Sequence, residues 1–408
     1  MQSFKIISEH KIIESNKKEV DYNIKKLQKQ KADLSSSKSQ LDVLYKNNSF
    51  VRYWKEFDPF KNEKKIVSKM GNTCNVSNAW LKCYELINYY NMLPEHVEGE
   101  FLHFDNAAFP GSFIISTYHF ANTKRNWSDK YKWMGSSLIT ENELDKEPLE
   151  DKYHLYKNYK DNWIMDDNMN GDVLVKENQL FMHNKFKGSV DLYTSDIGFD
   201  VSSDYNNQEL LQMPVNFGQV LSGLLILKKG GSFITKQYTS FESITVSLIY
   251  LASYFFDEFY VCKPYTSREA NSETYLVGKG FRQFDNIMEE PYIKLMFSWL
   301  EKFTDISSTY KIPLFDAKYY SRKFLEDMIH INEVITKKTI EKVNEDIKRI
   351  KKCLINGNYK ETHENPIVKE YNKVIEKNLI EWHMSNKVEP IPNNKKLNMV
   401  DFMNQYIR

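Results

Sequence analysis

A glycine pair that opens an apolar strand, with a lysine near its far end, is the feature that most constrains this chain. The segment Gly230–Tyr238 (GGSFITKQY) follows the helical apolar run Phe217–Lys229 and precedes a second apolar helix predicted over Phe241–Phe256, then a strand at Glu258–Cys262. Such alternation is typical of an α/β protein whose parallel sheet is covered by helices and binds ligands beyond the carboxyl ends of its strands. Lys236 lies at such an end.

The composition is that of a folded globular protein. Of its 408 residues, 41% are hydrophobic and 14% aromatic, which predicts a sizeable core and either two or three domains or one large domain with extensions. The net charge of +1 supplies no global positive field, so any contact with nucleic acid must come from a local patch. The four cysteines are scattered without C-x-x-C or Cys/His spacing, which argues against structural zinc and a disulfide framework.

Neither a leader nor a membrane span is expected. The N-terminus lacks an apolar core of signal-peptide length, and the longest apolar runs stay short of the roughly 18 residues that a spanning helix needs. We therefore expect a soluble protein of a reducing compartment, the cytosol or the nucleus.

Four further strands are expected before the glycine pair, at Glu100–Asp105, Tyr131–Ile139, Gly171–Val175 and Val190–Asp196. The first runs into NAAFPGSF and a helix, an arrangement that presents backbone N–H groups to an anionic or polar ligand. An acidic insertion, 140–161, follows the second. Asp172, at the start of the third, is placed to accept from an adenine amino group or a ribose hydroxyl, and is equally compatible with a turn.

Three more charged residues are candidates by position. A helix is predicted over 75–90, and Ser77 or Asn78 would cap its start. Lys82 lies off the middle of the apolar stripe of this helix, and taken alone it is predicted to be a surface residue. Asp196 ends the fourth strand, where a carboxylate is costly to bury unless it is paired. Glu273 opens a last strand, 274–278.

Both ends of the chain are predicted to be helical extensions, 1–70 and 283–408, of a central domain, 71–282. Near the N-terminus Val20, Leu27, Leu34 and Leu41 are seven residues apart with Lys31 and Lys38 between them, which favours a solvated helix along the main domain over a coiled coil. Helices are expected near the C-terminus at Glu289–Phe303, Lys318–Ile335 and Ile340–Leu354. The last carries a basic face, Lys348, Arg349, Lys351 and Lys352, that is either solvated or in contact with RNA.

The segments NAWLKCYELI, TSD, GGSFITKQY and SREANSETYLV contain Lys82, Asp196, Lys236 and Glu273, which we call the tetrad. Over about residues 71–280 the chain resembles the FtsJ-like family of ribose 2'-O-methyltransferases, and most of all the branch encoded by large DNA viruses. The resemblance implies a Rossmann-like sheet of seven strands flanked by helices, with the tetrad catalytic. Lys236 would deprotonate or steer the ribose hydroxyl, oriented by Asp196 and Glu273 with Lys82 on the other side.

The resemblance also implies S-adenosylmethionine as the cofactor, and its mechanism demands no metal. The expected cofactor residues are Asp105, Ala108, Phe109, Pro110, Gly111, Ser112, Phe113, Asp172 and Asp196. The chain departs from the family at this turn, because Ser112 replaces a glycine and Ala108 replaces an acidic residue. Asp105 is close enough in sequence to take over part of that role.

The implied activity is methylation of an RNA ribose next to the cap of an mRNA. Methylation of ribosomal or transfer RNA is one alternative, and a catalytically degenerate methyltransferase fold that binds RNA or belongs to a virion is another. A nicotinamide-dependent dehydrogenase is excluded, because no G-x-G-x-x-G follows the first strand. Expected partners are RNA, capped mRNA above all, and a protein held by the helical extensions. The expected location is the cytoplasm, a viral factory or a virion if the protein is viral.

Overall fold

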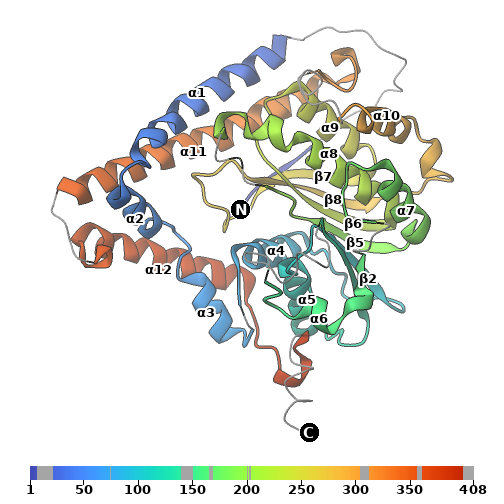
Figure 1. Ribbon diagram of the computed structural model, residues 1–408, viewed down its shortest axis with the longest axis horizontal. Coiled ribbons are helices and arrows are strands. Elements are labelled where there is room, and N and C mark those ends of the chain that lie inside the picture. The colour runs from blue at the N-terminus through green and yellow to red at the C-terminus, as the bar shows by residue number, and fades with distance from the viewer. Residues whose placement is uncertain are drawn as a thin grey trace.

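The computed structural model describes residues 1–6, 22–73, 75–138, 150–164, 169–199, 201, 204–303, 312–355 and 361–397. Within these ranges, eight strands form one sheet in the order β1-β7-β8-β6-β5-β2-β3-β4, with helices on both faces (Figure 1). The predicted α/β fold is therefore confirmed.

The strands are β1 (Gln2–Lys5), β2 (Phe101–Asn106), β3 (Tyr131–Ser136), β4 (Trp163–Ile164), β5 (Val190–Ser195), β6 (Leu227–Gln237), β7 (Phe256–Lys263) and β8 (Thr274–Phe281). Strands β2 to β8 form the expected seven-stranded sheet. Strand β1 adds an eighth from a segment predicted to be a helical extension, and pairs antiparallel with β7.

The sheet is mixed, whereas the sequence predicted a parallel one. Strands β2 to β6 are mutually parallel, but β8 lies antiparallel between β6 and β7. The segment that joins β7 to β8, which we call the β7–β8 loop (264–273), contains no helix, and a return without a crossover pairs strands antiparallel. As a result, the start of β8 lies beside the end of β6.

The strand predicted at Gly171–Val175 is wrong. Those residues form a turn, because the Asp172 carboxylate accepts a hydrogen bond from the backbone N–H of Leu174 at 2.8 Å and closes the chain on itself. The strand at this edge of the sheet is instead β4, which comes before the turn in the sequence. Ile139, at the predicted end of β3, and residues 140–149 of the insertion lie outside the described residues.

The helices are α1 (Tyr22–Leu44), α2 (Asn48–Glu56), α3 (Glu63–Met70), α4 (Asn78–Tyr90), α5 (Ser112–Lys124), α6 (Leu155–Asn158), α7 (Lys176–Phe186), α8 (Gln208–Ile226), α9 (Ser243–Ser253), α10 (Pro291–Leu300), α11 (Arg322–Ile355) and α12 (Pro366–Asn386). Helices α4 and α5 cover one face of the sheet, and α7 to α10 cover the other (Figure 1).

The two helices predicted at Lys318–Ile335 and Ile340–Leu354 form a single helix in the structure. Helix α11 runs without a break from Arg322 to Ile355, because no glycine or proline interrupts the helix-forming residues between them. Helices α2, α3 and α12 lie within the extensions predicted to be helical but were not predicted individually, and α6 and α7 were not predicted.

Helix α1 lies alongside α11 (Figure 1). Leu27 and Leu34 are buried in the same core as α9 and α11, so the helix lies along the main domain as predicted, but one of its faces is buried and only the others are solvated. The lysines between these leucines reach the sheet domain: Lys31 forms an ion pair with Glu242 at 2.7 Å, and Lys38 donates a hydrogen bond to Ser272. Val20 lies outside the described residues.

Both terminal regions therefore share a core with the sheet, and the domain boundaries at residues 70 and 282 stay predictions. Cys83, Cys262 and Cys353 are buried free thiols, and Cys74 lies outside the described residues. Across the described part of the chain, none of the helices combines the length and apolar character that crossing a bilayer requires.

Candidate active site

Lys82 is held by a helix that begins where the sequence predicted. The Ser77 hydroxyl caps α4 by accepting a hydrogen bond from the Trp80 N–H at 3.0 Å. Helix α4 packs against the sheet, and the Lys82 side chain is 9% exposed with its ammonium turned toward Glu273. Taken alone, the helix pattern would have put this lysine on the surface.

The other three tetrad residues meet because of strand order. Asp196 directly follows β5, and Lys236 lies near the end of β6, which pairs parallel with β5. Lys236 is opposite Tyr275 in the antiparallel pairing of β6 with β8, so Glu273, just before β8, lies at the same edge. The insertion of β8 between β6 and β7 thus brings Glu273 to the two basic residues.

The tetrad forms one connected cluster. Lys236 Nζ lies 3.3 Å from Asp196 Oδ1 and donates a hydrogen bond to the Asp196 backbone carbonyl at 2.8 Å. Lys82 Nζ lies 2.9 Å from Glu273 Oε2 and 4.0 Å from Asp196 Oδ2. The structure therefore brings together all four residues that the sequence singled out.

Asp196 is the centre of this cluster. Burial alone would raise the pKa of its carboxyl group, but the ammonium groups of Lys236 and Lys82 outweigh burial and hold that pKa below its ordinary value. The Tyr275 hydroxyl adds a hydrogen bond to Asp196 Oδ1 at 2.8 Å. Asp196 is thus an anion that can orient both lysines at neutral pH.

Glu273 is fixed by the β7–β8 loop. The Ser267 hydroxyl donates to Glu273 Oε1 at 3.0 Å, and the Lys263 ammonium donates to the Glu273 backbone carbonyl at 2.9 Å and to Asn271 Oδ1 at 2.8 Å. Glu85, one turn after Lys82 on α4, accepts from the backbone N–H groups of the same loop at Tyr265 and Thr266. One helix therefore carries Lys82 and also anchors the loop that presents its partner.

Sequence reasoning missed Lys263, Glu85 and the role of Tyr275. A signal for Lys263 was present, because it ends an apolar strand, β7, as Lys236 does in β6. Tyr275 belongs to the segment that carried the family resemblance. Glu85 left no comparable trace, because an acid within a helix is ordinary.

Lys263 should make stability depend on pH. Burial lowers the pKa of its amino group to about 7, with Lys38 and Lys82 acting in the same direction and Glu273 opposing them. The unfolded chain, with an ordinary lysine pKa, binds more protons than the folded one above pH 7, so this contribution to stability rises with pH. We expect the free energy of unfolding of wild type minus that of Lys263→Met to rise by about 1.4 kcal/mol per pH unit between roughly pH 8 and 9.5.

Chemical denaturation of both proteins at several pH values measures this difference. The exposed Lys337, replaced by methionine in the same way, is the control and should give a difference that does not change with pH. A Lys263→Met difference that is constant or falls with pH would contradict the prediction.

The expected cofactor turn joins β2 to α5. Gly111 has φ +107°, and a Cβ there would lie 2.3 Å from Leu155 Cδ1, so the glycine is needed for both conformation and space. The Ser112 hydroxyl is hydrogen-bonded: its Oγ lies 2.9 Å from Ser77 Oγ and 3.2 Å from Tyr153 Oη. The serine that replaces a family glycine thus ties the turn to the cap of the helix that carries Lys82.

The turn is also joined to the end of β3. The N–H of Ala108 donates to the Ser136 carbonyl at 2.9 Å, and that of Phe109 donates to Ser137 Oγ at 3.0 Å. Pro110 lies between Phe109 and the cap glycine, and Phe113 is buried in the first turns of α5. A Cβ on Gly171 would lie 2.2 Å from the Ser137 carbonyl, so the turn that contains Asp172 abuts the same edge.

Asp105 is buried in β2 beneath this turn. Its carboxyl group accepts a hydrogen bond from Thr194 Oγ1 at 2.6 Å, and burial raises its pKa well above the ordinary value. Its contribution to cofactor binding stays a prediction, as does that of Asp172.

The residues at this edge fit a polar cofactor. The buried Ser136 hydroxyl, at the end of β3, has no hydrogen-bond partner among the described residues. The N-cap of α5 is a glycine that offers no side chain to the first N–H groups of the helix, and such a terminus favours polar or anionic groups of a ligand. The tetrad lies near this edge, because the charge of Asp196 adds to burial in raising the pKa of the Asp105 carboxyl group. A role of Asp196 in cofactor binding stays a prediction.

Comparisons with known proteins agree with this geometry. The family model for FtsJ-like methyltransferase matches residues 75–281, about half of the chain. The probable methyltransferase EP424R of African swine fever virus is 36% identical over 322 residues, which cover 74% of this chain and 72% of that protein. The cap-specific mRNA (nucleoside-2'-O-)-methyltransferase 2 of Drosophila melanogaster is 30% identical over 232 residues, which cover 54% of this chain and 32% of that protein.

Among solved structures, human methyltransferase-like protein 13 in complex with SAH is 14% identical with a TM-score of 0.30, over 57% of this chain and 90% of that chain. The family match contains the whole tetrad and the cofactor turn, and the similarity to proteins of a large DNA virus confirms the expected branch. The chain therefore belongs to the FtsJ-like methyltransferase family and is an S-adenosylmethionine-dependent methyltransferase.

Proposed function

We propose that this protein methylates the 2'-hydroxyl of an RNA ribose, at the nucleotide next to the cap of an mRNA. The observation that carries the proposal is the tetrad, in which Asp196 lies between the ammonium groups of Lys236 and Lys82 at the carboxyl edge of the sheet. The similarity to proteins named for cap-specific 2'-O-methylation supports the choice of substrate.

S-Adenosylmethionine supplies an electrophilic methyl group. In the reaction the sulfur–methyl bond breaks, an oxygen–methyl bond forms at the ribose, and the hydroxyl proton is lost, which leaves S-adenosylhomocysteine and a methylated ribose. The protein must therefore position the hydroxyl in line with the methyl group and ease the loss of its proton.

Lys236 is oriented for that task. Two of its bonding directions are occupied by the backbone carbonyl and Oδ1 of Asp196. The remaining direction would meet the ribose oxygen, where Lys236 acts in one of two ways: an N–H of its ammonium steers the hydroxyl, or the lone pair of its neutral amine takes the hydroxyl proton and the amine becomes an ammonium. In either case an ammonium then offsets the negative charge that develops on the ribose oxygen.

Lys82 and Glu273 complete the arrangement. Two lysines and two carboxylates make a formally neutral cluster, so neither acid leaves an unpaired charge at this partly buried edge. Lys82 contacts both acids, and Glu273 is held from behind by Ser267. We assign these two residues to positioning Asp196 and Lys236.

The test is methyl transfer from labelled S-adenosylmethionine to short RNAs that differ in one feature at a time. One RNA is capped, one is uncapped, and one is capped but already carries a 2'-O-methyl group on its first nucleotide. We expect the capped RNA with a free 2'-hydroxyl to be labelled, and the other two to be labelled far less.

Equal labelling of capped and uncapped RNA would contradict the proposal that the enzyme acts next to a cap. Equal labelling of the RNA that is already methylated would place the methyl group elsewhere. Digestion of the product to nucleosides then identifies the modified atom.

A further inference from the structure

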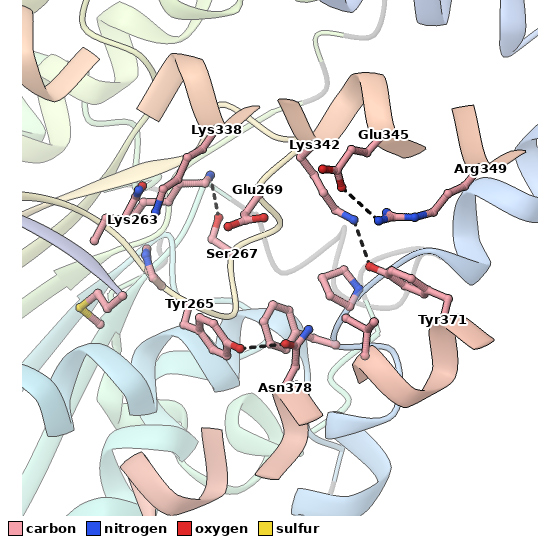
Figure 2. Close-up of a pocket in the computed structure, with 16 residues that line it drawn as sticks. Lys263, Tyr265, Ser267, Glu269, Lys338, Lys342, Glu345, Arg349, Tyr371 and Asn378 are labelled. Carbon is pink, nitrogen blue, oxygen red and sulfur yellow. Dashed lines mark hydrogen bonds and ion pairs between the residues drawn. The ribbon is translucent and has the colours of Figure 1, made fainter. Parts of the chain in front are cut away.

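A polar pocket of about 420 Å³ lies between the sheet and the C-terminal helices (Figure 2). One wall is the end of β7 and the β7–β8 loop, and the opposite walls are faces of α11 and α12. Its size is within the range of roughly 300–1,000 Å³ that is usual for small-molecule sites. The pocket is distinct from the cofactor turn, and the family resemblance did not point to it.

Four basic side chains line this pocket, namely Lys263, Lys338, Lys342 and Arg349, against two acids, Glu269 and Glu345 (Figure 2). Since burial lowers the pKa of Lys263 to about 7, the charges of Lys338, Lys342 and Arg349 give the pocket a small local excess of positive charge over the two acids. Groups of this kind attract and hold phosphates.

The cations differ in how they are held. Lys342 donates to Asp346 at 2.8 Å and to the Tyr371 hydroxyl at 3.0 Å, and Arg349 pairs with Asp346 and Glu345, each at 3.0 Å. These two form a fixed rim. Lys338 is exposed, forms no ion pair with a described residue, and extends from α11 toward β7 in Figure 2. Its ammonium group is therefore available to a ligand.

Two residues of the pocket wall also contact the tetrad. Ser267 and Lys263 line it, and they also donate hydrogen bonds to the side chain and the backbone carbonyl of Glu273. Strand β7 runs parallel to β6, since β8 is antiparallel to both, so Lys263 and Lys236 lie at the same edge of the sheet. A ligand here would lie at the same edge of the sheet as one that binds at Lys236, with β8 between β7 and β6.

We propose that this pocket binds a phosphate-bearing nucleotide of the RNA strand that is methylated at the tetrad, with Lys338 as a direct phosphate contact. The inference rests on the proposed function, because an RNA substrate is what links the two sites. It also changes the prediction of a basic face at Lys348, Arg349, Lys351 and Lys352, which lie on α11. Arg349 lines the pocket together with Lys338 and Lys342, whereas the other three lysines are exposed and do not line it.

The test compares Lys338→Gln with Lys337→Gln. Both lysines are exposed and adjacent on α11, and the substitutions remove the same charge, but Lys337 does not line the pocket. The affinity of the full chain for a short single-stranded RNA with a fluorescent label is measured over a series of salt concentrations. We expect Lys338→Gln to weaken binding about three-fold to ten-fold and to lower the slope of log K against log salt by about 0.7, as loss of one phosphate contact does.

Lys337→Gln should leave both quantities as in wild type, and neither variant should change the affinity for S-adenosylmethionine. Equal effects of the two substitutions, or no effect of either, would overturn the proposal. Methyl transfer is measured on the same samples to separate the two ideas. If RNA binding depends on Lys338 but no RNA is methylated, only the proposed function is contradicted. If RNA is methylated but its binding does not depend on Lys338, only the proposed role of the pocket is contradicted.

Discussion

Replacing Lys236 with methionine should lower the rate of methyl transfer by about 10²-fold to 10⁴-fold, the range for loss of a group that handles the proton. Methionine is similar in length and fills the space of a side chain that is only 10% exposed, but it leaves the Asp196 carboxylate paired only with Lys82 at 4.0 Å, so the variant should fold with a lower free energy of unfolding. The affinities for S-adenosylmethionine and RNA should stay near those of wild type, because the loss is confined to the group that faces the ribose oxygen. Single-turnover transfer and equilibrium binding measure the two effects separately.

Lys229→Met is the matched control, since Lys229 is an exposed lysine at the other end of the same strand. It should keep the wild-type rate. A Lys236→Met protein that retains more than about a tenth of that rate would remove Lys236 from the chemistry, because so small a loss is below what such groups contribute.

Replacing Asp196 with asparagine should reduce both activity and stability. The substitution leaves the ammonium of Lys236 without its carboxylate at a site where the two side chains are 10% and 20% exposed. Breaking a buried pair by removing one partner costs about 3–5 kcal/mol, and partial exposure of this pair places the expected loss of unfolding free energy near 3 kcal/mol. Methyl transfer should fall by about 10²-fold or more, because Lys236 loses the group that orients it.

The pH dependence of this stability loss has a defined sign. The pKa of Asp196 is lower in the folded protein than its ordinary value, so its stabilisation is fully present above the ordinary pKa and is lost as pH falls through the folded one. The difference in unfolding free energy between wild type and Asp196→Asn should therefore be constant near neutral pH and shrink below about pH 4.

Urea denaturation at neutral and acidic pH measures this difference. Asp33→Asn, at an exposed position of α1, is the control and should change the free energy of unfolding very little at either pH. If Asp196→Asn were as stable as wild type at neutral pH, the ion pairs around Asp196 would not stabilise the fold.

Much of the fold could be predicted because its signals are local. Apolar strands bounded by glycine and acidic residues placed β2, β5, β6 and β8 within a few residues of their observed bounds, and Ser77 marked the start of α4. The prediction failed at 171–175, where an Asp172 hydrogen bond closed a turn within an apolar run. It was incomplete at α1, which lies along the main domain as predicted but whose polar composition concealed leucines that are buried in the main core.

The candidate site was predicted residue by residue, but its roles stay predictions. The family resemblance supplied the four positions, and each of them alone was compatible with an ordinary surface charge. Only the structure places Lys82 at 2.9 Å from Glu273, 191 residues away. It also shows that Ser112, a departure from the family pattern, is bonded to the cap of α4.

By itself, the sequence determined the periodic elements, the α/β class and the residue types at the strand ends, because helix and strand formation depends on side chains a few positions apart. Tertiary structure alone decided that β8 would lie antiparallel between β6 and β7 and that Lys263 would be buried behind Glu273, with the half-buried Lys38 bonded to Ser272. It also decided that α11 and α12 would close a pocket of basic side chains against the β7–β8 loop. These features depend on the packing of segments far apart in the chain, as in the 234 residues between Lys38 and Ser272, and such contacts leave no period in the sequence.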